Sequence, residues 1–156
     1  MKWKKYVPYA LSILLALLVG FLGSLATQRG LPAYEQLVKP QLTPPAAVFP
    51  VAWTILYLLM GFGAAMIWRA ESPLRRPALI VYAVQLLMNG LWSFFFFGLG
   101  LYCFSFAWLA ALWFLVLNMI DLFRRIDSTA GNLQVPYLLW LTFAGYLNLG
   151  ICILNR

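Results

Sequence analysis

The chain has 156 residues, of which 64% are hydrophobic, 17% aromatic and only 10% charged. This composition is too apolar for a soluble domain, and the length is too short for two membrane domains, so we predict one membrane domain over residues 1–156. The net charge of +7 comes from basic residues scattered in short segments between apolar runs, which indicates membrane topology and excludes a nucleic-acid partner.

Histidine is absent, and the two cysteines, Cys103 and Cys152, both lie inside apolar runs. Histidine-ligated haem and zinc sites therefore have no support in the sequence, and we predict no metal and no resident cofactor. For the same reason the sequence does not favour a disulfide framework.

Uncharged runs follow one another at lengths that suit membrane helices. A 23-residue run such as 6–28, at about 1.5 Å per residue, covers the roughly 30 Å hydrocarbon core. Gly98-Leu99-Gly100 divides the uncharged stretch 77–120, because glycine tolerates the left-handed conformation that ends a helix. We therefore predict an all-α membrane protein, a five-transmembrane-helix bundle with spans at about 6–28, 46–68, 77–97, 101–123 and 132–154.

The first run also resembles a secretory signal peptide, with Ser24-Leu25-Ala26 as a small-x-small site. It is longer than an ordinary signal core, which favours a retained span. Residues 29–45 form a polar connection that contains prolines and is longer than a turn requires, which is typical of a lid or binding loop. Residues 124–131 are predicted to form another polar loop.

The basic residues are distributed unequally between the two predicted sides. Five spans place the N-terminus and the segments 69–76 and 124–131 on one side, which we predict to be cytoplasmic because it is the richer in lysine and arginine. The C-terminus and the long first loop are then extracytoplasmic. The basic residues of the first side are Lys2, Lys4, Lys5, Arg69, Arg75, Arg76, Arg124 and Arg125, and those of the second are Arg29, Lys39 and Arg156.

Aromatic and amide side chains recur on single helix faces in the predicted outer half of the membrane. Helical spacing places together Phe49, Trp53 and Tyr57; Gln85, Asn89 and Trp92; and Trp140, Ala144 and Asn148, while the first span adds Ser24. One interpretation is helix packing with interhelical hydrogen bonds between amides. The other is a ligand pocket under the 29–45 loop, which the nearby small residues Gly61 and Gly63 favour.

The spans carry no charged residue deep in the membrane, which disfavours proton relays and ion-coupled transport. The sequence also has no nucleophile–base constellation, phosphate loop or carboxylate pair. Hydrolytic and phosphoryl-transfer chemistry are therefore excluded, and no catalytic residue is predicted on these grounds.

At these residues the chain resembles the translocator protein family, also called the tryptophan-rich sensory proteins. The resemblance covers nearly the whole length, in linked blocks that occur in the family's order. These blocks are AYEQLVKPQLTPP (33–45), VFPVAWTILYLLMG (48–61), QLLMNGLWSFFF (85–96) and VPYLLWLTFAGYLN (135–148).

The resemblance implies a five-helix bundle, usually homodimeric, with a pocket beneath the first loop. It also implies binding of porphyrins such as protoporphyrin IX, cholesterol-like lipids and synthetic benzodiazepine or isoquinoline ligands. Ala33 and Leu42 stand where the family usually has tryptophan, and no basic residue follows Tyr146 at the spacing of the animal cholesterol motif. By family pattern the lid residues are Tyr34, Pro44 and Pro45, and the lining residues are Trp53, Asn89, Trp140, Ala144 and Asn148.

We therefore predict a membrane receptor or translocator that binds porphyrins or similar flat hydrophobic molecules in an outward-opening pocket. Its expected partners are that ligand, membrane lipid and a second copy of the chain. Two alternatives remain: a light-dependent porphyrin-degrading enzyme that uses the indoles of Trp53 and Trp140, and a regulatory membrane partner whose pocket is incidental. The predicted ligand-binding residues are Ser24, Tyr34, Pro44, Pro45, Phe49, Trp53, Tyr57, Asn89, Trp92, Trp140, Ala144 and Asn148.

Overall fold

The computed structural model describes residues 2–156, and all regular structure in this range is helical. Three short segments are the 3₁₀ turn η1 (Lys2–Lys5), the π-helical η2 (Phe94–Gly98) and α5 (Ser128–Asn132). Five segments are long and apolar enough to cross a membrane, which confirms the predicted all-α architecture with five spans. They are built on α1 (Val7–Glu35), α2 (Val48–Arg69), α3 (Arg75–Ser93), α4 (Tyr102–Ile126) and α6 (Val135–Leu154).

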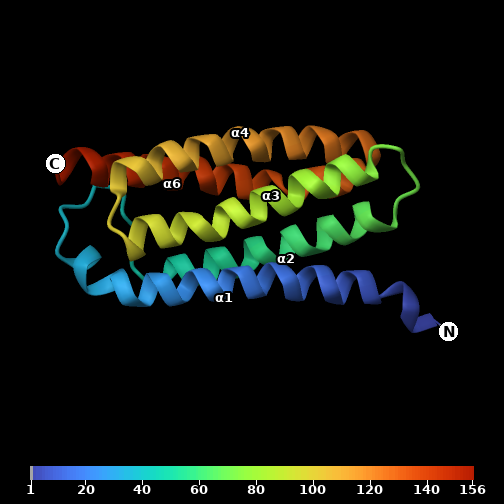
Figure 1. The fold of residues 1–156 in the computed structure, drawn as a ribbon, viewed down its shortest axis with the longest axis horizontal. Coiled ribbons are helices and arrows are strands. Elements are labelled where there is room, and N and C mark those ends of the chain that lie inside the picture. Colours follow the sequence, from blue (N-terminus) through green and yellow to red (C-terminus); the bar gives the residue numbers. More distant parts are fainter. Residues whose placement is uncertain (1) are drawn as a thin grey trace.

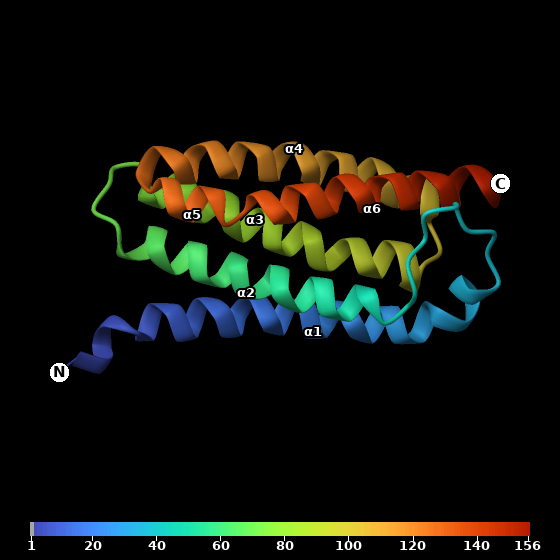
Figure 2. The same ribbon diagram turned by 180° about the vertical axis from the view of Figure 1, so that it is seen from behind.

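The helices run lengthwise in one bundle, with α1 and α2 along one side and α4 and α6 along the other (Figures 1 and 2). The α3 helix lies between the two sides and contacts α1, α2 and α4. Within the described residues, the backbones of α2 and α6, and likewise those of α3 and α6, approach each other less closely than those of α1 and α2 or of α4 and α6. Side chains therefore have to fill the space between α2 and α6.

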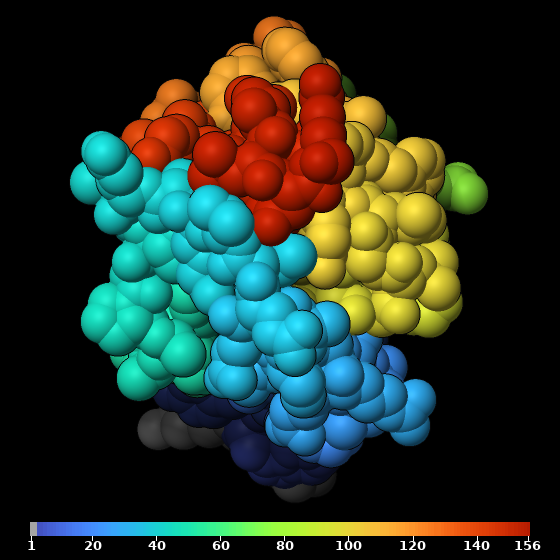
Figure 3. Space-filling model, turned by 90° about the vertical axis from the view of Figure 1, so that its left-hand side faces the viewer, coloured from blue at the N-terminus to red at the C-terminus, as the bar shows by residue number. Residues whose placement is uncertain are grey.

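The two ends of the bundle carry different segments. The C-terminus, residues 36–47 and the turn that follows η2 lie at one end, and the N-terminus and residues 70–74 lie at the other (Figure 1). Asn155 ties the first end together, because its side-chain amide donates to the Val38 carbonyl and accepts from the Val38 N–H, each at 2.9 Å. Residues 36–47 consequently lie across this end, between the C-terminal residues and α1 (Figure 3).

The first helix is longer than predicted, since α1 continues to Glu35 and shortens the expected loop 29–45 to residues 36–47. Pro32 lies inside the helix, where it removes one backbone hydrogen bond. Packing supports this last part of α1, because Gly30 lies so close to the backbone of Phe97 that a Cβ there would clash. Arg29 and Pro32 indicated that the first helix ends before them, but the tertiary contact of Gly30 with Phe97 favours its continuation.

The predicted polar loop 124–131 is also largely helical. The α4 helix continues to Ile126, with Arg124 and Arg125 in its last turn, where positive charge is favourable for the helix dipole. Asp127 then caps α5 by accepting a hydrogen bond from the Ala130 N–H at 3.0 Å. By contrast, the predicted break after the third span is confirmed, and Gly100 provides it with a φ of 64°.

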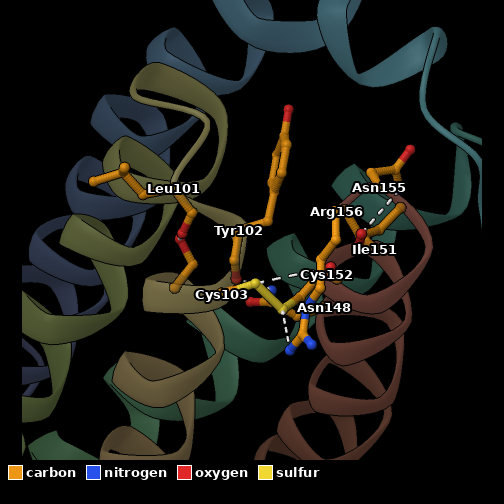
Figure 4. Close-up of a disulfide and its surroundings, with 9 residues drawn as sticks. Leu101, Tyr102, Cys103, Asn148, Ile151, Cys152, Asn155 and Arg156 are labelled. Carbon is orange, nitrogen blue, oxygen red and sulfur yellow. Dashed lines mark hydrogen bonds between the residues drawn. A yellow bond between two sulfur atoms is a disulfide. The ribbon is translucent and has the colours of Figure 1, made fainter.

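A disulfide joins Cys103 at the start of α4 to Cys152 near the end of α6, with the two Cα atoms 4.9 Å apart (Figure 4). The sequence prediction against a disulfide is therefore wrong. Apolar surroundings do not reveal pairing, whereas two packed antiparallel helices bring the start of one beside the end of the other. The disulfide lies at the same end of the bundle as residues 36–47.

Candidate ligand-binding site

Five aromatic rings fill the space between α2 and α6. Phe49, Trp53 and Tyr57 lie on one face of α2, as their four-residue spacing predicts. Phe49 and Trp53 meet Tyr137 and Trp140 of α6, and Tyr57 stacks on Trp53. Trp53 is at the centre: its ring centroid lies 5.7 Å from that of Tyr57, 6.3 Å from that of Trp140 and 6.4 Å from that of Tyr137. We call these five residues the α2–α6 aromatic cluster.

A chain of buried hydrogen bonds connects this cluster to α3. The Tyr57 hydroxyl donates to Asn89 Oδ1 at 2.6 Å, and Asn89 Nδ2 donates to the Tyr137 hydroxyl oxygen at 2.7 Å. The Tyr137 hydroxyl in turn donates to Gln85 Oε1 at 2.9 Å. Asn89 and Gln85 are thus paired across helices, as the packing interpretation predicts, and the chain links α2, α3 and α6 under the rings.

A second polar pair joins α3 to α6 nearer the end that carries the C-terminus. Trp92 Nε1 donates to Asn148 Oδ1 at 3.0 Å, and Asn148 Nδ2 donates to the Tyr102 carbonyl at 2.7 Å. The Trp92 ring also stacks on Phe96 of η2, with centroids 5.1 Å apart. The structure therefore brings two predicted residues, Trp92 and Asn148, into direct contact and satisfies both polar groups.

One buried polar group in the α2–α6 aromatic cluster has no hydrogen-bond partner. The indole N–H of Trp140 is buried and makes no hydrogen bond, while the Trp140 ring contacts Phe49, Trp53 and Phe143 edge-on or tilted. Leaving such a donor buried and unpaired costs about 1–3 kcal/mol. An acceptor atom on a ligand inserted among these rings would remove that cost.

The predicted lid residues occupy different places. Tyr34 packs on Phe96 and Phe97, with the Lys39 ammonium 5.0 Å above its ring centroid. Pro44 and Pro45 lie in the connection that enters α2. Since Val48 N–H donates to the Pro45 carbonyl, this connection turns directly into the helix that carries Phe49 and Trp53.

Some predicted residues do not join the aromatic cluster as expected. The Ser24 hydroxyl donates to the Phe21 carbonyl of its own helix at 2.6 Å. The small residues expected beside a pocket serve helix packing: a Cβ on Gly61 would lie 2.5 Å from Ile13 Cα, and one on Gly63 would clash with Gln134. Ala144 is buried in the hydrophobic core, one helical turn from Trp140.

Two cavities of the described residues lie outside the cluster. One is a groove of about 260 Å³ between α4 and α6, with Trp113, Thr142 and Gly145 in its wall. The other, of about 420 Å³, lies where α2 ends and α3 begins. In this conformation the rings of the α2–α6 aromatic cluster pack against one another.

Tyr137 is the residue of the candidate site that the sequence reasoning missed. It is fully buried and forms two links of the hydrogen-bond chain as well as a ring contact with Trp53. Its position three residues before Trp140 places it on the same helix face, and this spacing could have identified it.

Comparison with known proteins agrees with this architecture. Residues 12–154 match the model of the TspO/MBR family. The chain is 39% identical to the tryptophan-rich protein TspO of Chlorobaculum tepidum, over 97% of this chain and 98% of that protein. It is 40% identical to the tryptophan-rich sensory protein of Cereibacter sphaeroides, over 78% of this chain and 76% of that protein. The translocator protein of Bos taurus is 33% identical, over 92% of this chain and 87% of that protein.

The family match covers most of the first span and the other four spans in full, with both polar pairings and every residue of the aromatic cluster. This chain is therefore a multi-pass integral membrane protein that belongs to the TspO/MBR family of translocator and tryptophan-rich sensory proteins.

Proposed function

We propose that the protein binds porphyrins, or similar flat hydrophobic molecules that carry acceptor oxygens, at the α2–α6 aromatic cluster. The observation that carries this proposal is the buried, unpaired N–H of Trp140 among five rings. The two helices are bridged there by side chains, so a flat ligand replaces ring–ring contacts with ring–ligand contacts. The hydrogen-bond chain from Tyr57 to Gln85 forms the polar floor of this site.

The ligand enters from the end covered by residues 36–47, where Tyr34, Pro44 and Pro45 form the entrance. This end is extracytoplasmic by the basic-residue asymmetry. The Cys103–Cys152 disulfide supports the same orientation, because disulfides persist in oxidising compartments outside the cytosol.

The test compares three chains in lipid discs: wild type, Trp140→Phe and Trp113→Phe. Trp140→Phe keeps a flat ring but loses the N–H, so affinity for protoporphyrin IX falls about fivefold, the equivalent of one hydrogen bond. Trp113 lies in the α4–α6 groove, where it donates to Thr142, and Trp113→Phe is the matched control with unchanged affinity.

The shift of the porphyrin absorption band measures binding without depending on the number of tryptophans. If Trp140→Phe and Trp113→Phe bind protoporphyrin IX with equal affinity, the proposed location of the site is contradicted. No saturable binding by the wild type contradicts the function, and favours a protein whose role is regulatory contact with another membrane protein.

A second candidate function is photo-oxidative degradation of the bound porphyrin. The observation in its favour is that the oxidisable indoles of Trp53 and Trp140 lie in contact, with centroids 6.3 Å apart, so both reach the same ligand. An enzyme yields a defined product under light, and Trp53→Phe and Trp140→Phe lose product formation far more than binding. A pure binder returns porphyrin that bleaches no faster than free porphyrin.

A further inference from the structure

The larger of the two cavities described above lies far from the aromatic cluster, at the end that carries the N-terminus and residues 70–74 (Figure 1). It has a volume of about 420 Å³ and is open to the outside of the bundle between the last residues of α2 and the first turns of α3. Its lining residues are Trp68, Arg75, Arg76, Leu79, Ile80 and Ala83. We call this cavity the α2–α3 groove.

The α2–α3 groove is amphiphilic along the axis of α3. Its lining residues on that helix recur at four-residue spacing, so they form one strip with two guanidinium groups at the helix start and apolar side chains below them. From Arg76 to Ala83 the strip descends by about 10 Å. Ile80 is 54% exposed and Trp68 is 43% exposed, so the apolar part is accessible to lipid.

Both arginines at the mouth lack an anionic partner. Among the described residues, the one ion pair joins Arg125 to Asp121, and no carboxylate, including that of Glu71 in the adjacent connection, pairs with Arg75 or Arg76. Arg75 Nη1 reaches only the carbonyls of Trp68 and Ala70, at 3.5 and 3.4 Å. Two unneutralised guanidinium groups therefore face the same mouth.

The third arginine of this region is directed elsewhere. Arg69 lies over the ring of Tyr9 on α1, with its Cζ 5.6 Å from the ring centroid. The charge of the α2–α3 groove thus comes from Arg75 and Arg76. Trp68 stands beside them at the end of a membrane span, a position where indole rings favour the lipid interface.

We propose that the α2–α3 groove binds one anionic phospholipid from the leaflet at the N-terminal end of the bundle. Arg75 and Arg76 donate to its phosphate oxygens, and one acyl chain follows Leu79, Ile80 and Ala83 against the Trp68 indole. The apolar strip selects a lipid over free phosphate, and the uncompensated double positive charge selects an anionic headgroup over a zwitterionic one. This proposal is independent of the porphyrin site.

The experiment uses the full chain in phosphatidylcholine vesicles that contain a small fraction of lipid brominated in the acyl chain. Bromine quenches nearby indoles, and the difference between wild type and Trp68→Phe isolates the signal of Trp68 among seven tryptophans. Each arginine near the membrane surface contributes about a fivefold preference for anionic lipid. We therefore expect brominated phosphatidylglycerol to quench Trp68 at a mole fraction at least about tenfold lower than brominated phosphatidylcholine.

Three variants separate the contributions of charge and shape. Arg75→Gln with Arg76→Gln abolishes the preference for phosphatidylglycerol. The control variant, Arg124→Gln with Arg125→Gln, loses the same formal charge at the same end of the bundle. Both of its substitutions lie outside the groove, so we expect it to retain the preference for phosphatidylglycerol. Ala83→Phe fills the apolar strip and weakens quenching by both lipids.

Four results contradict the proposal. One is equal quenching by both lipids in the wild type, and another is equal loss of preference in the two double variants. The third is the absence of quenching by either lipid, which means that another surface, such as a second copy of the chain, covers the groove. Displacement of the brominated lipid by inorganic phosphate contradicts the acyl-chain assignment.

Discussion

Asn89 is the residue whose role the structure changes most. Both ends of its amide are paired, since Oδ1 accepts from Tyr57 and Nδ2 donates to Tyr137. Asn89 therefore holds three helices together as well as lying under the aromatic cluster, and replacing it affects stability before it affects binding. Trp140 differs, because its N–H has no partner to lose and its replacement by phenylalanine leaves the packing largely intact.

Asn89→Leu should destabilise the protein by about 1–3 kcal/mol, because the Tyr57 hydroxyl is left buried without an acceptor. Thermal unfolding in lipid discs measures this loss. Tyr57→Phe in the Asn89→Leu background removes the orphaned hydroxyl and should recover part of the stability, whereas Tyr57→Phe alone should destabilise. Additive effects of the two substitutions would show that the hydrogen bond between them is not formed.

At the scale of elements, the end of the bundle that carries the C-terminus is stabilised by a disulfide and, separately, by side-chain hydrogen bonds. The disulfide fixes the start of α4 to the end of α6 (Figure 4). The hydrogen bonds of Asn155 to Val38 fix residues 36–47 to the same end of α6. The ring of Pro40 also packs against Gly150. The disulfide, the Asn155 hydrogen bonds and this contact therefore hold in place the end of the bundle where we propose that the ligand enters.

Replacing both cysteines by serine should lower the free energy of unfolding by about 2–4 kcal/mol, because the disulfide restricts the unfolded chain across a separation of 49 residues. The unfolding temperature measures the effect. A reductant should lower it for the wild type and leave the double variant unchanged. Rapid labelling of both wild-type cysteines by a thiol reagent without reductant would contradict the disulfide.

At the scale of the whole molecule, the two ends differ in charge as well as in structure. The N-terminus and residues 70–74, which the count of basic residues assigns to the same side of the membrane, lie at the same end of the bundle (Figure 2). The bundle's outer surface is strongly apolar, above all along α1, where Leu14, Leu18 and Phe21 are exposed. Such a surface suits lipid and a second copy of the chain.

Topology can be tested with single cysteines in the wild-type chain, whose two native cysteines are paired. Gln41→Cys in the exposed first loop should react with an impermeant thiol reagent added to intact cells. Thr129→Cys on α5 should react only after the membrane is permeabilised. Both residues are exposed, so accessibility in the fold is matched. The reverse pattern of labelling would invert the orientation and with it the direction of ligand entry.

The family resemblance also predicts a homodimer. Sedimentation in mild detergent and mass measurement in lipid discs should give twice the chain mass of 17.7 kDa, plus bound lipid or detergent. Introducing arginine at Leu18, on the lipid-exposed face of α1, tests whether that helix forms the contact. A monodisperse monomer in both environments would count against the homodimer.

The amino-acid sequence by itself determined the helical class, the number and order of the spans, and the shared faces of Phe49 with Trp53 and of Gln85 with Asn89. These features depend on apolar run length and helical periodicity, which are local. The tertiary structure decided that α1 passes Pro32, that Cys103 meets Cys152, that Tyr137 is the partner of Asn89, and that Ser24 bonds within its own helix. Each of these depends on which helices are neighbours and at what depth they align, and this alignment is set by packing between segments distant in sequence.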